Sequence, residues 1–389
     1  MNTFLYKLIR RIRRVLYTIV YDCLFHLPLI KNNRILFISW GGQYFNCNPR
    51  AFAEYIRDRK EGFELIAIVK NTKQYRGIAG IRFVKLNSIS HIYYLASSRV
   101  VVSNHHLPEY IKRKGQYYIQ MWHGIGSKKS EKDSEDSYRP ELMRKVIRES
   151  KQADLMPSGS KWYSNWIKTS TWHEGKILEC GYPRYDCFFN RDIIQERKDL
   201  VYKYYGVELD LKTVMYAPSF RSIGEIQESF FNPEPLLEEL SNHFGGNWKL
   251  LIRLHPLVSN APLPEMLSSD NNGTVINVTK YPEMQDLLCA ADILITDFSS
   301  ISTDFLKMLK PCFIYAPDFY TYDRGLYFSP QELPYPFALT EEELFKNISN
   351  FDYDSYIKAV ARYNEFMGMC DDGHASERIF DYMKKNFLN

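Results

Sequence analysis

The sequence lacks the short patterns that mark several common classes of enzyme and secreted protein. Its seven cysteines are scattered, odd in number and never spaced as CxxC, and no secretory cleavage pattern is evident. We therefore expect a cytoplasmic protein with unpaired thiols. No GxGxxG follows a predicted strand and no Walker P-loop occurs, so a dinucleotide cofactor has no support. The GxSxG elbow of Ser–His–Asp hydrolases is also missing. A paired-carboxylate glycosidase stays open, although no pattern points to it.

Net charge is confined to one short segment. Residues 1–30 contain five basic residues and one acidic residue, Asp22, which account for the formal net charge of +4 of the 389-residue chain. Because the rest sums to about zero, nucleic-acid binding through a basic surface is not expected. With 45% hydrophobic and 25% charged residues, the chain can bury a large core.

The first 30 residues predict a basic amphipathic helix. On a helical wheel, apolar residues such as Leu5, Ile12 and Ile19 fall on one side, opposite five basic residues: Lys7, Arg10, Arg11, Arg13 and Arg14. Such a helix lies in a membrane interface and contacts anionic headgroups. Asp22 and His26 interrupt the short apolar run at 15–30, which disfavours a transmembrane span. The alternative is a helix packed on its own domain with a solvated basic face.

From residue 34 onward, apolar runs of strand length alternate with amphipathic segments of helical length. We expect strands at 35–40, 65–69, 81–84, 100–103, 117–121, 153–156, 177–179, 213–217, 249–254, 274–278, 292–296 and 312–315. Expected helices include 50–57, 141–150, 234–244, 282–290, 300–310 and a tail from 355. Many strands are apolar on both faces, as buried parallel strands are, so the alternation predicts doubly wound α/β domains.

A break at about 186–210 divides this series into two Rossmann-like halves, 31–190 and 205–389. Ligands of such sheets bind at the carboxyl ends of the strands. The cleft between the halves is therefore the expected site.

One strand, at 117–121, is followed directly by a histidine, glycines and two lysines. A histidine here is suited to accept a proton from a hydroxyl nucleophile, because its pKa is near neutrality; we assign His123 this role. Gly124 allows close approach of a substrate, and Lys128 and Lys129 are suited to hold a phosphate. The alternative is a structural histidine at a strand end, before an ordinary loop.

The strand at 249–254 ends in Arg253 and His255. These residues lie two apart, so one face of the strand carries both, and a phosphate there would gain a charge-assisted contact. Ser219 and Arg221 follow the strand at 213–217 and offer a hydroxyl and a guanidinium to the same cleft. The alternative for Arg253 is a solvated side chain at a capped strand end.

The strand at 292–296 runs into a cluster of hydroxyls and then a predicted helix. Backbone N–H groups at a helix start, together with hydroxyls, form an anion site. A plain helix cap would use the same residue types but would need one hydroxyl. The sequence has Thr296, Ser299, Ser300 and Ser302, which favours phosphate binding.

No metal site is predicted. His105 and His106 are adjacent, so on a strand they would face opposite ways, and no carboxylate cluster accompanies them. The ends of the strands at 117–121, 213–217, 249–254 and 292–296 together offer His, Arg, Ser and Thr side chains and few carboxylates. This combination predicts a cleft that binds phosphate.

These segments resemble the CDP-glycerol glycerophosphotransferases of teichoic acid and capsule synthesis. The resemblance is carried by WHG at 122–124, YAPSFR at 216–221, RLHP at 253–256, EMQDLL at 283–288 and DILITDFSS at 292–300. Their order and spacing match across about 115–325, and DGHASER at 372–378 is similar to the family's closing helix. Phe298 stands where the family often has Tyr, and Gly126 and Ser127 stand where many members have other residues.

The resemblance implies a GT-B-like fold, with 31–190 as the acceptor domain and 205–389 as the nucleotide-donor domain. It implies transfer of glycerol phosphate from CDP-glycerol to a hydroxyl of a lipid-linked (undecaprenyl diphosphate) acceptor, with release of CMP. His123 would be the base and His255 would contact the donor phosphates.

The resemblance also implies that the segment with Thr296, Asp297, Ser299 and Ser300 holds the diphosphate. We place Ser219, Arg221 and Arg253 on the donor side, and Gly124, Lys128 and Lys129 on the acceptor side. We expect no cofactor apart from the CDP-glycerol donor, no metal, and a peripheral location on the cytoplasmic face of the membrane. The alternatives are a CDP-ribitol transferase, a GT-B glycosyltransferase, and a non-catalytic membrane scaffold.

Overall fold

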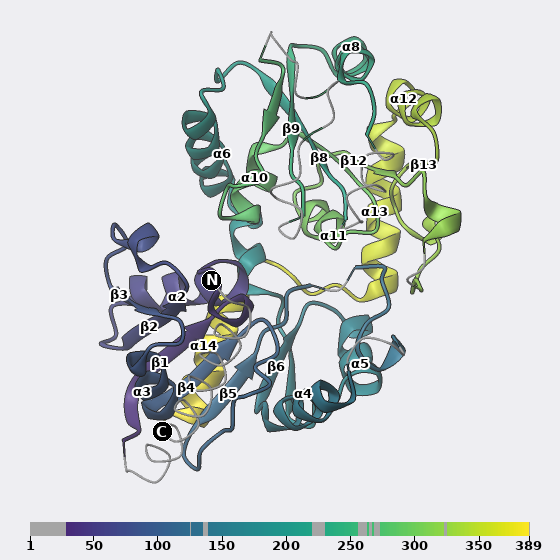
Figure 1. Cartoon of the computed structure of the whole chain (residues 1–389). Coiled ribbons are helices and arrows are strands. Elements are labelled where there is room, and N and C mark those ends of the chain that lie inside the picture. Colours follow the sequence, from purple (N-terminus) through teal and green to yellow (C-terminus); the bar gives the residue numbers. More distant parts are fainter. Residues whose placement is uncertain are drawn as a thin grey trace, which may run out of the picture.

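The structure is a computed structural model that describes residues 29–124, 126–134, 139–219, 230–255, 263, 267, 273–322 and 325–388. The helix predicted at 1–30, apart from its last two residues, and Arg221 lie outside the described residues. The described chain forms two bodies, each built on one sheet (Figure 1).

The N-terminal body has a sheet of seven parallel strands in the order β3-β2-β1-β4-β5-β6-β7. The strands are β1 Lys31–Ile38, β2 Glu64–Val69, β3 Ile81–Lys85, β4 Ser98–Ser103, β5 Tyr117–Gln120, β6 Leu155–Ser158 and β7 Lys176–Glu179. Its helices are α2 Cys47–Arg59, α3 Ile89–Ser97, α4 Pro140–Gln152 and α5 Lys161–Ser170. Strand order reverses between β1 and β4, where ligands of doubly wound sheets bind.

The C-terminal body repeats this plan with six parallel strands in the order β10-β9-β8-β11-β12-β13. The strands are β8 Lys212–Ala217, β9 Trp248–Ile252, β10 Val275–Asn277, β11 Ile293–Thr296, β12 Cys312–Tyr315 and β13 Phe337–Ala338. Its helices are α6 Arg191–Tyr205, α8 Pro233–Phe244, α10 Met284–Ala290, α11 Ile301–Leu306, α12 Glu341–Ser349 and α13 Tyr353–Met367. Here the order reverses between β8 and β11.

Short one-turn helices complete the connections. They are η1 Trp40–Gly42, η2 Thr72–Tyr75, η3 Glu131–Asp133, η4 Pro183–Phe189, η6 Phe319–Thr321 and η7 Pro330–Glu332. Of these, η4 lies just before the crossing between the two bodies.

Strand β1 shows why the sheets are buried on both faces. Ile35 and Phe37 pack in one apolar cluster, whereas Leu36 and Ile38 pack in another. Successive side chains of a strand point to opposite faces, so an uninterrupted apolar run requires a layer of packing on each side.

The last helix, α14 Ala375–Phe387, returns to the N-terminal body. Ile379, Phe380 and Met383 are fully buried in the cluster that contains Phe37 of β1. Figure 1 shows this helix beside β4 and β5, after a crossing from α13. The predicted C-terminal range 205–389 includes α14, but the apolar side of this helix is buried against the first sheet.

Each predicted strand is confirmed, the one at 312–315 with the same ends and the others with shifted ends, and β13 is an additional two-residue edge strand. The helix predicted at 300–310 ends earlier, at Leu306. Leu309 has a φ of 57° and Pro311 follows shortly after, so the helix does not continue. Among the described residues, none of the helices combines the length and apolar character needed to cross a bilayer.

Candidate active site

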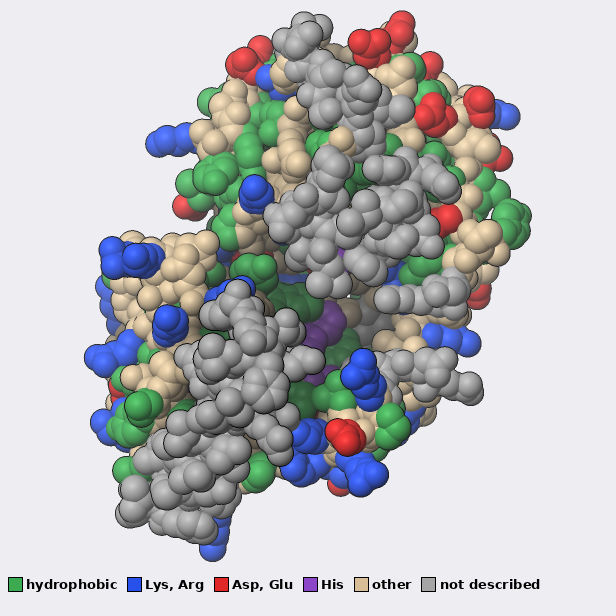
Figure 2. Space-filling view, in the orientation of Figure 1, with side chains coloured by type: hydrophobic (Ala, Val, Ile, Leu, Met, Phe, Trp, Pro, Cys, Tyr) green, Lys and Arg blue, Asp and Glu red, His purple; other side chains and the backbone are tan. Residues whose placement is uncertain are grey.

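Predicted residues from both bodies lie together at the facing edges of the two sheets. Lys128, after β5, donates from Nζ to the Ser219 hydroxyl after β8 over 2.6 Å. A Cβ added at Gly126 would lie 3.0 Å from the Ser300 nitrogen. The loop after β5 therefore packs directly on the start of α11. Figure 2 shows histidine side chains in the hollow between the two bodies.

His123 is half-buried and held in one tautomer. Its Nδ1 lies 2.8 Å from the carbonyl oxygen of Asn104. A carbonyl only accepts, so Nδ1 carries the proton and Nε2 keeps its lone pair. The ring stacks on Trp122 and also contacts Trp40, each with its centroid 4.7 Å away. Burial lowers the pKa of His123 to about 3, with a smaller effect of His105. The imidazole is therefore neutral at pH 7.

The loop that carries His123 is fixed by Asn48 of α2. The Asn48 side-chain amide donates to the carbonyl oxygens of Met121 (3.2 Å) and Trp122 (2.9 Å). Trp122 has a φ of 54°, in the left-handed region that non-glycine residues seldom adopt. Strained backbone of this kind persists where its surroundings hold it. Asn48 is fully buried and provides that hold.

His106 is accompanied by two carboxylates, contrary to the sequence interpretation. Its Nδ1 lies 2.6 Å from Glu149 of α4, and its Nε2 lies 3.1 Å from Glu131 of η3. Burial alone would lower the pKa of His106, but hydrogen bonds to Glu131 and Glu149 outweigh it and raise the pKa to about 10. His106 is therefore an imidazolium. The two glutamates lie far along the chain, so spacing did not reveal them.

This cluster is not a metal site. No group of histidine, cysteine, aspartate and glutamate suited to a metal occurs in the part of the chain that the structure describes. Both ring nitrogens of His106 are engaged with carboxylates. The charged network ties α4 and η3 to the end of β4, next to the ring of Trp122 at 5.4 Å.

On the opposite side of the cleft, Asp297 positions Ser219. The Asp297 carboxylate accepts from the Ser219 nitrogen at 2.9 Å and from its hydroxyl at 2.6 Å. Asp297 is 5% exposed, and a direct contact between its carboxylate and a phosphate would be repulsive. The hydroxyl of Ser219 donates to Asp297 and accepts from Lys128, so these three residues form one chain across the cleft.

Two predicted phosphate ligands point into the fold. Thr296 is fully buried, and its hydroxyl donates to the Ala217 carbonyl at 2.6 Å. Arg253 donates from Nη1 to the carbonyls of Val278 (2.9 Å), Thr279 and Tyr281 (2.7 Å). These contacts hold the neighbouring strand ends, so both side chains serve the fold.

The remaining predicted residues lie around the cleft. Ser299 and Ser300 are half-buried at the start of α11, and His255 is half-buried after the end of β9. Lys129 is exposed, and its backbone nitrogen donates to the Gly325 carbonyl at 2.8 Å. Gly124 has a φ of 98° and lies against Arg184, a residue that the sequence did not single out.

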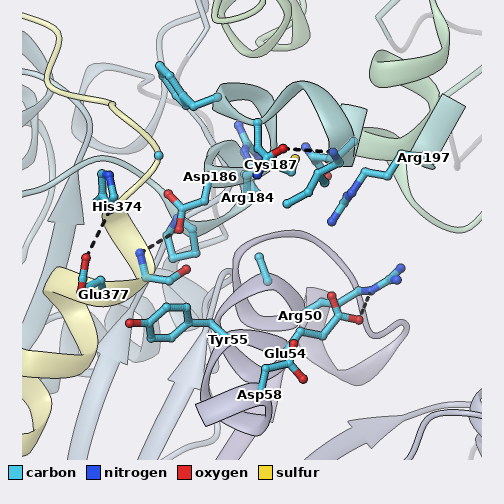
Figure 3. Close-up of a pocket in the computed structure, with 18 of the residues that line it drawn as sticks. Arg50, Glu54, Tyr55, Asp58, Arg184, Asp186, Cys187, Arg197, His374 and Glu377 are labelled. Carbon is cyan, nitrogen blue, oxygen red and sulfur yellow. Dashed lines mark hydrogen bonds and ion pairs between the residues drawn. The ribbon is translucent and has the colours of Figure 1, made fainter. Parts of the chain in front are cut away.

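A cavity of about 570 Å³ lies behind this cleft, lined by α2, η4, the start of α6 and the turn before α14 (Figure 3). Its charged side chains are mostly paired. Arg197 donates to Asp286 at 2.8 Å, and Arg50 lies 3.5 Å from Glu283. Glu283 also accepts from the Cys47 nitrogen at 3.2 Å. The EMQDLL segment therefore braces the joint between the bodies.

A family model of CDP-Glycerol:Poly(glycerophosphate) glycerophosphotransferases matches residues 19–385. The chain belongs to this family.

The similar curated proteins are enzymes named for teichoic acid synthesis. The chain is 29% identical to a teichoic acid poly(glycerol phosphate) polymerase of Bacillus subtilis, covering 97% of this chain and 52% of the polymerase. It is 27% identical to a teichoic acid glycerol-phosphate transferase of Staphylococcus aureus, covering 90% and 92%. The chain thus spans about half the length of the polymerases from B. subtilis and Staphylococcus epidermidis.

A solved structure has the same two-body fold. The wall teichoic acid polymerase TagF superposes with a TM-score of 0.84 at 27% identity, covering 98% of this chain and 96% of that chain. UDP-GlcNAc 2-epimerase from Neisseria meningitidis, at 14% identity and a TM-score of 0.52, shares the fold alone; it covers 91% of this chain and 100% of that chain. The GT-B-like architecture is confirmed.

The close approach at Gly124 yields a stability prediction. A Cβ at Gly124 would lie 2.4 Å from Arg184 Nη2, whereas Gly62, at a φ of 79°, has open space around it. We expect Gly62→Ala to lose about 1–2 kcal/mol of unfolding free energy from backbone strain alone. Gly124→Ala should lose roughly 1–3 kcal/mol more from overpacking. Urea unfolding of both variants measures the difference, and equal losses would contradict the contact.

Proposed function

We propose that the protein transfers glycerol phosphate from CDP-glycerol to a hydroxyl of a lipid-linked acceptor and releases CMP, in teichoic acid or capsule synthesis. Family membership supports the donor class, and so does a solved structure of TagF soaked with CDPG. The observation that carries the proposal is the packing of the His123 loop on the start of α11. It brings a neutral imidazole and a serine-bearing helix start into one crevice.

The proposed reaction is an in-line displacement at the β-phosphorus. The acceptor hydroxyl gives its proton to His123 Nε2 while its oxygen forms the new bond to phosphorus. The bond from the β-phosphorus to the bridging oxygen breaks, and that oxygen leaves on CMP. Every atom of the donor is then found either in the extended acceptor or in CMP.

The low pKa of His123 fits this role once the donor is considered. A base with a pKa of about 3 is unprotonated at neutral pH, but it accepts a proton only weakly. The negative diphosphate of a bound donor favours the imidazolium by Coulomb attraction and raises the pKa. The pKa of His123 would therefore rise when the donor binds, toward the neutral pH at which a general base is most effective.

On the donor side we assign the diphosphate to Ser299, Ser300 and His255. We also move Lys128 there from the acceptor side expected from the sequence, because its Nζ contacts Ser219 of the C-terminal body. Backbone N–H groups at the start of a helix and charge-assisted donors stabilise phosphoryl oxygens. Ser219 would act through Lys128, which it contacts. Arg221 follows the same strand and stays a prediction on the donor side. Gly124 and Lys129 stay predictions on the acceptor side.

A ribitol-phosphate donor is the second candidate. The chain is 24% identical to a teichoic acid ribitol-phosphate primase of Bacillus spizizenii, covering 98% of both chains. The proposed chemistry at phosphorus is the same for both polyols, so the base and the phosphate contacts do not distinguish them.

We further propose that residues 1–30 dock on the anionic cytoplasmic face of the membrane. This segment carries five basic residues along one side of a predicted amphipathic helix. A lipid-linked acceptor lies in the same membrane, so docking would raise its effective concentration at the cleft.

A donor panel tests the function. The full chain is incubated with CDP-glycerol, CDP-ribitol and UDP-sugars together with membranes that contain acceptor, and release of CMP or UDP is measured. We expect CMP release with CDP-glycerol that depends on acceptor. Faster turnover of CDP-ribitol would favour the second candidate, and no turnover with any donor would favour a scaffold.

Replacing His123 and replacing His255 should have different effects on turnover and on donor binding. His123→Ala should lower kcat by about 10²–10⁴-fold, the usual contribution of a general base, with CDP-glycerol affinity largely kept. His255→Ala should also weaken CDP-glycerol binding, measured by calorimetry. His243→Ala is the control, because His243 lies in α8 and contacts the Phe351 carbonyl at 2.9 Å. Near-normal turnover of His123→Ala would refute the base assignment.

Membrane docking is tested by liposome flotation. The intact chain should float with vesicles that contain anionic phosphatidylglycerol, and a variant without residues 1–30 should not. Raising the salt concentration should weaken flotation, because the headgroup attraction is screened. Equal flotation of both proteins would show that another surface binds the lipid.

A further inference from the structure

We propose that Arg184 is a positioning residue that sets the His123 loop against α11. It holds the backbone of the proposed base from one side and the helix of the proposed diphosphate site from the other. This inference rests on the proposed function for its kinetic consequences, whereas its geometry is independent of any substrate.

Arg184 lies in η4 and contacts both sides of the cleft. Its Nη1 donates to the His123 carbonyl oxygen at 2.6 Å, and its Nη2 donates to the Asp304 carboxylate in α11 at 2.6 Å. Its backbone nitrogen donates to Asn48 at 3.1 Å. The side chain is 5% exposed. One planar guanidinium therefore fixes the distance between a loop of the N-terminal body and a helix of the C-terminal body.

Asp304 lies one helical turn after Ser300, on the same face of α11. Its carboxylate also accepts from the Tyr185 hydroxyl at 2.5 Å and from the Gln285 amide at 3.3 Å. Donors from η4 and α10 therefore converge on one buried carboxylate. Because α11 has only six residues, an anchor at Asp304 also constrains the helix start beside the cleft.

Asn48 contacts both the His123 loop and Arg184. Its amide nitrogen holds the carbonyls of Met121 and Trp122, and its amide oxygen accepts from the Arg184 nitrogen. Three successive carbonyls, at 121, 122 and 123, are thus held by the Asn48–Arg184 pair. The backbone before and at His123 has no remaining freedom to shift without breaking a buried hydrogen bond.

The charge of Arg184 also acts on the His123 ring. The titratable and charged groups that influence His123 are His105 and His106, after β4, and Arg184, from η4; each opposes protonation of the ring. Removing the guanidinium charge should therefore raise the pKa of His123. The acid limb of kcat/KM, which requires the unprotonated ring, should move to higher pH.

Arg197 provides a matched control. It lines the same cavity, donates to a carboxylate (Asp286) at 2.8 Å, and is labelled with Arg184 in Figure 3. The experiment compares Arg184→Lys with Arg197→Lys. It also compares the neutral pairs Arg184→Gln/Asp304→Asn and Arg197→Gln/Asp286→Asn, which avoid leaving a buried charge unpaired.

We expect Arg184→Lys to keep its KM for CDP-glycerol within about threefold while kcat falls by about 10–100-fold, since a lysine cannot hold both partners in a fork. Arg197→Lys should change neither constant by more than about threefold. Only the neutral pair at 184 and 304 should move the acid limb to higher pH, because the guanidinium contacts the His123 backbone directly whereas Asp304 lies on its other nitrogen. A fall in kcat that is the same for both lysine variants would overturn the proposal, since it would reflect general damage to the joint.

A second readout does not depend on turnover. With ¹³C-labelled histidine in the full chain, the His123 signal, assigned by its loss in His123→Gln, is titrated by NMR. The neutral pair at 184 and 304 should raise its titration midpoint, and the pair at 197 and 286 should leave it unchanged. Unchanged midpoints in both would refute the proposal. If the wild-type chain transfers no donor, the proposed function fails and this titration still decides the role of Arg184.

Discussion

The buried ion pair between Arg184 and Asp304 joins two bodies that are each built on their own sheet. A site made from the ends of two sheets depends on contacts that cross between them, and here these include an apolar cluster shared by both bodies as well as polar contacts. A buried pair is seldom a net gain over well-packed apolar side chains, but it is costly to break. Its value here is geometric, because both ends of the guanidinium contact groups that line the cleft.

Two histidines near this joint are driven to opposite charge states by their surroundings. His106 is flanked by Glu131 and Glu149 and stays protonated to about pH 10. His123 has a carbonyl on one nitrogen and aromatic rings on its faces, and stays neutral down to about pH 3. Environments that separate two pKa values in this way assign different roles to the same residue type. The imidazolium of His106 is used to hold α4 and η3, and it also disfavours a second positive charge on His123.

The sequence predicted the strands because buried parallel strands are long apolar runs, and it placed His123, Ser219 and Ser300 at one cleft because parallel strand ends share an edge. It did not reveal Arg184, since the carboxylate that Arg184 pairs with, Asp304, lies 120 positions away in the chain. Arg253 and Thr296 have the right chemistry for phosphate, but their side chains fold back onto carbonyls. Residue type and spacing identify a strand end, whereas side-chain direction depends on neighbouring loops that no local pattern specifies.

The return of α14 to the first body explains why the joint needs so many polar contacts. The chain crosses between the bodies twice, before α6 and again between α13 and α14 (Figure 1). Asp371 braces the second crossing: it accepts from the Tyr182 nitrogen at 3.1 Å and pairs with Lys307, just after α11, at 2.7 Å. Residues of both connections line the cavity in Figure 3, and a relative rotation of the bodies would change the contact between the His123 loop and the start of α11. Arg184 lines that cavity and also contacts the His123 loop, so any such rotation must change the geometry of the guanidinium, and the contacts that fix the cleft are also those that resist its opening.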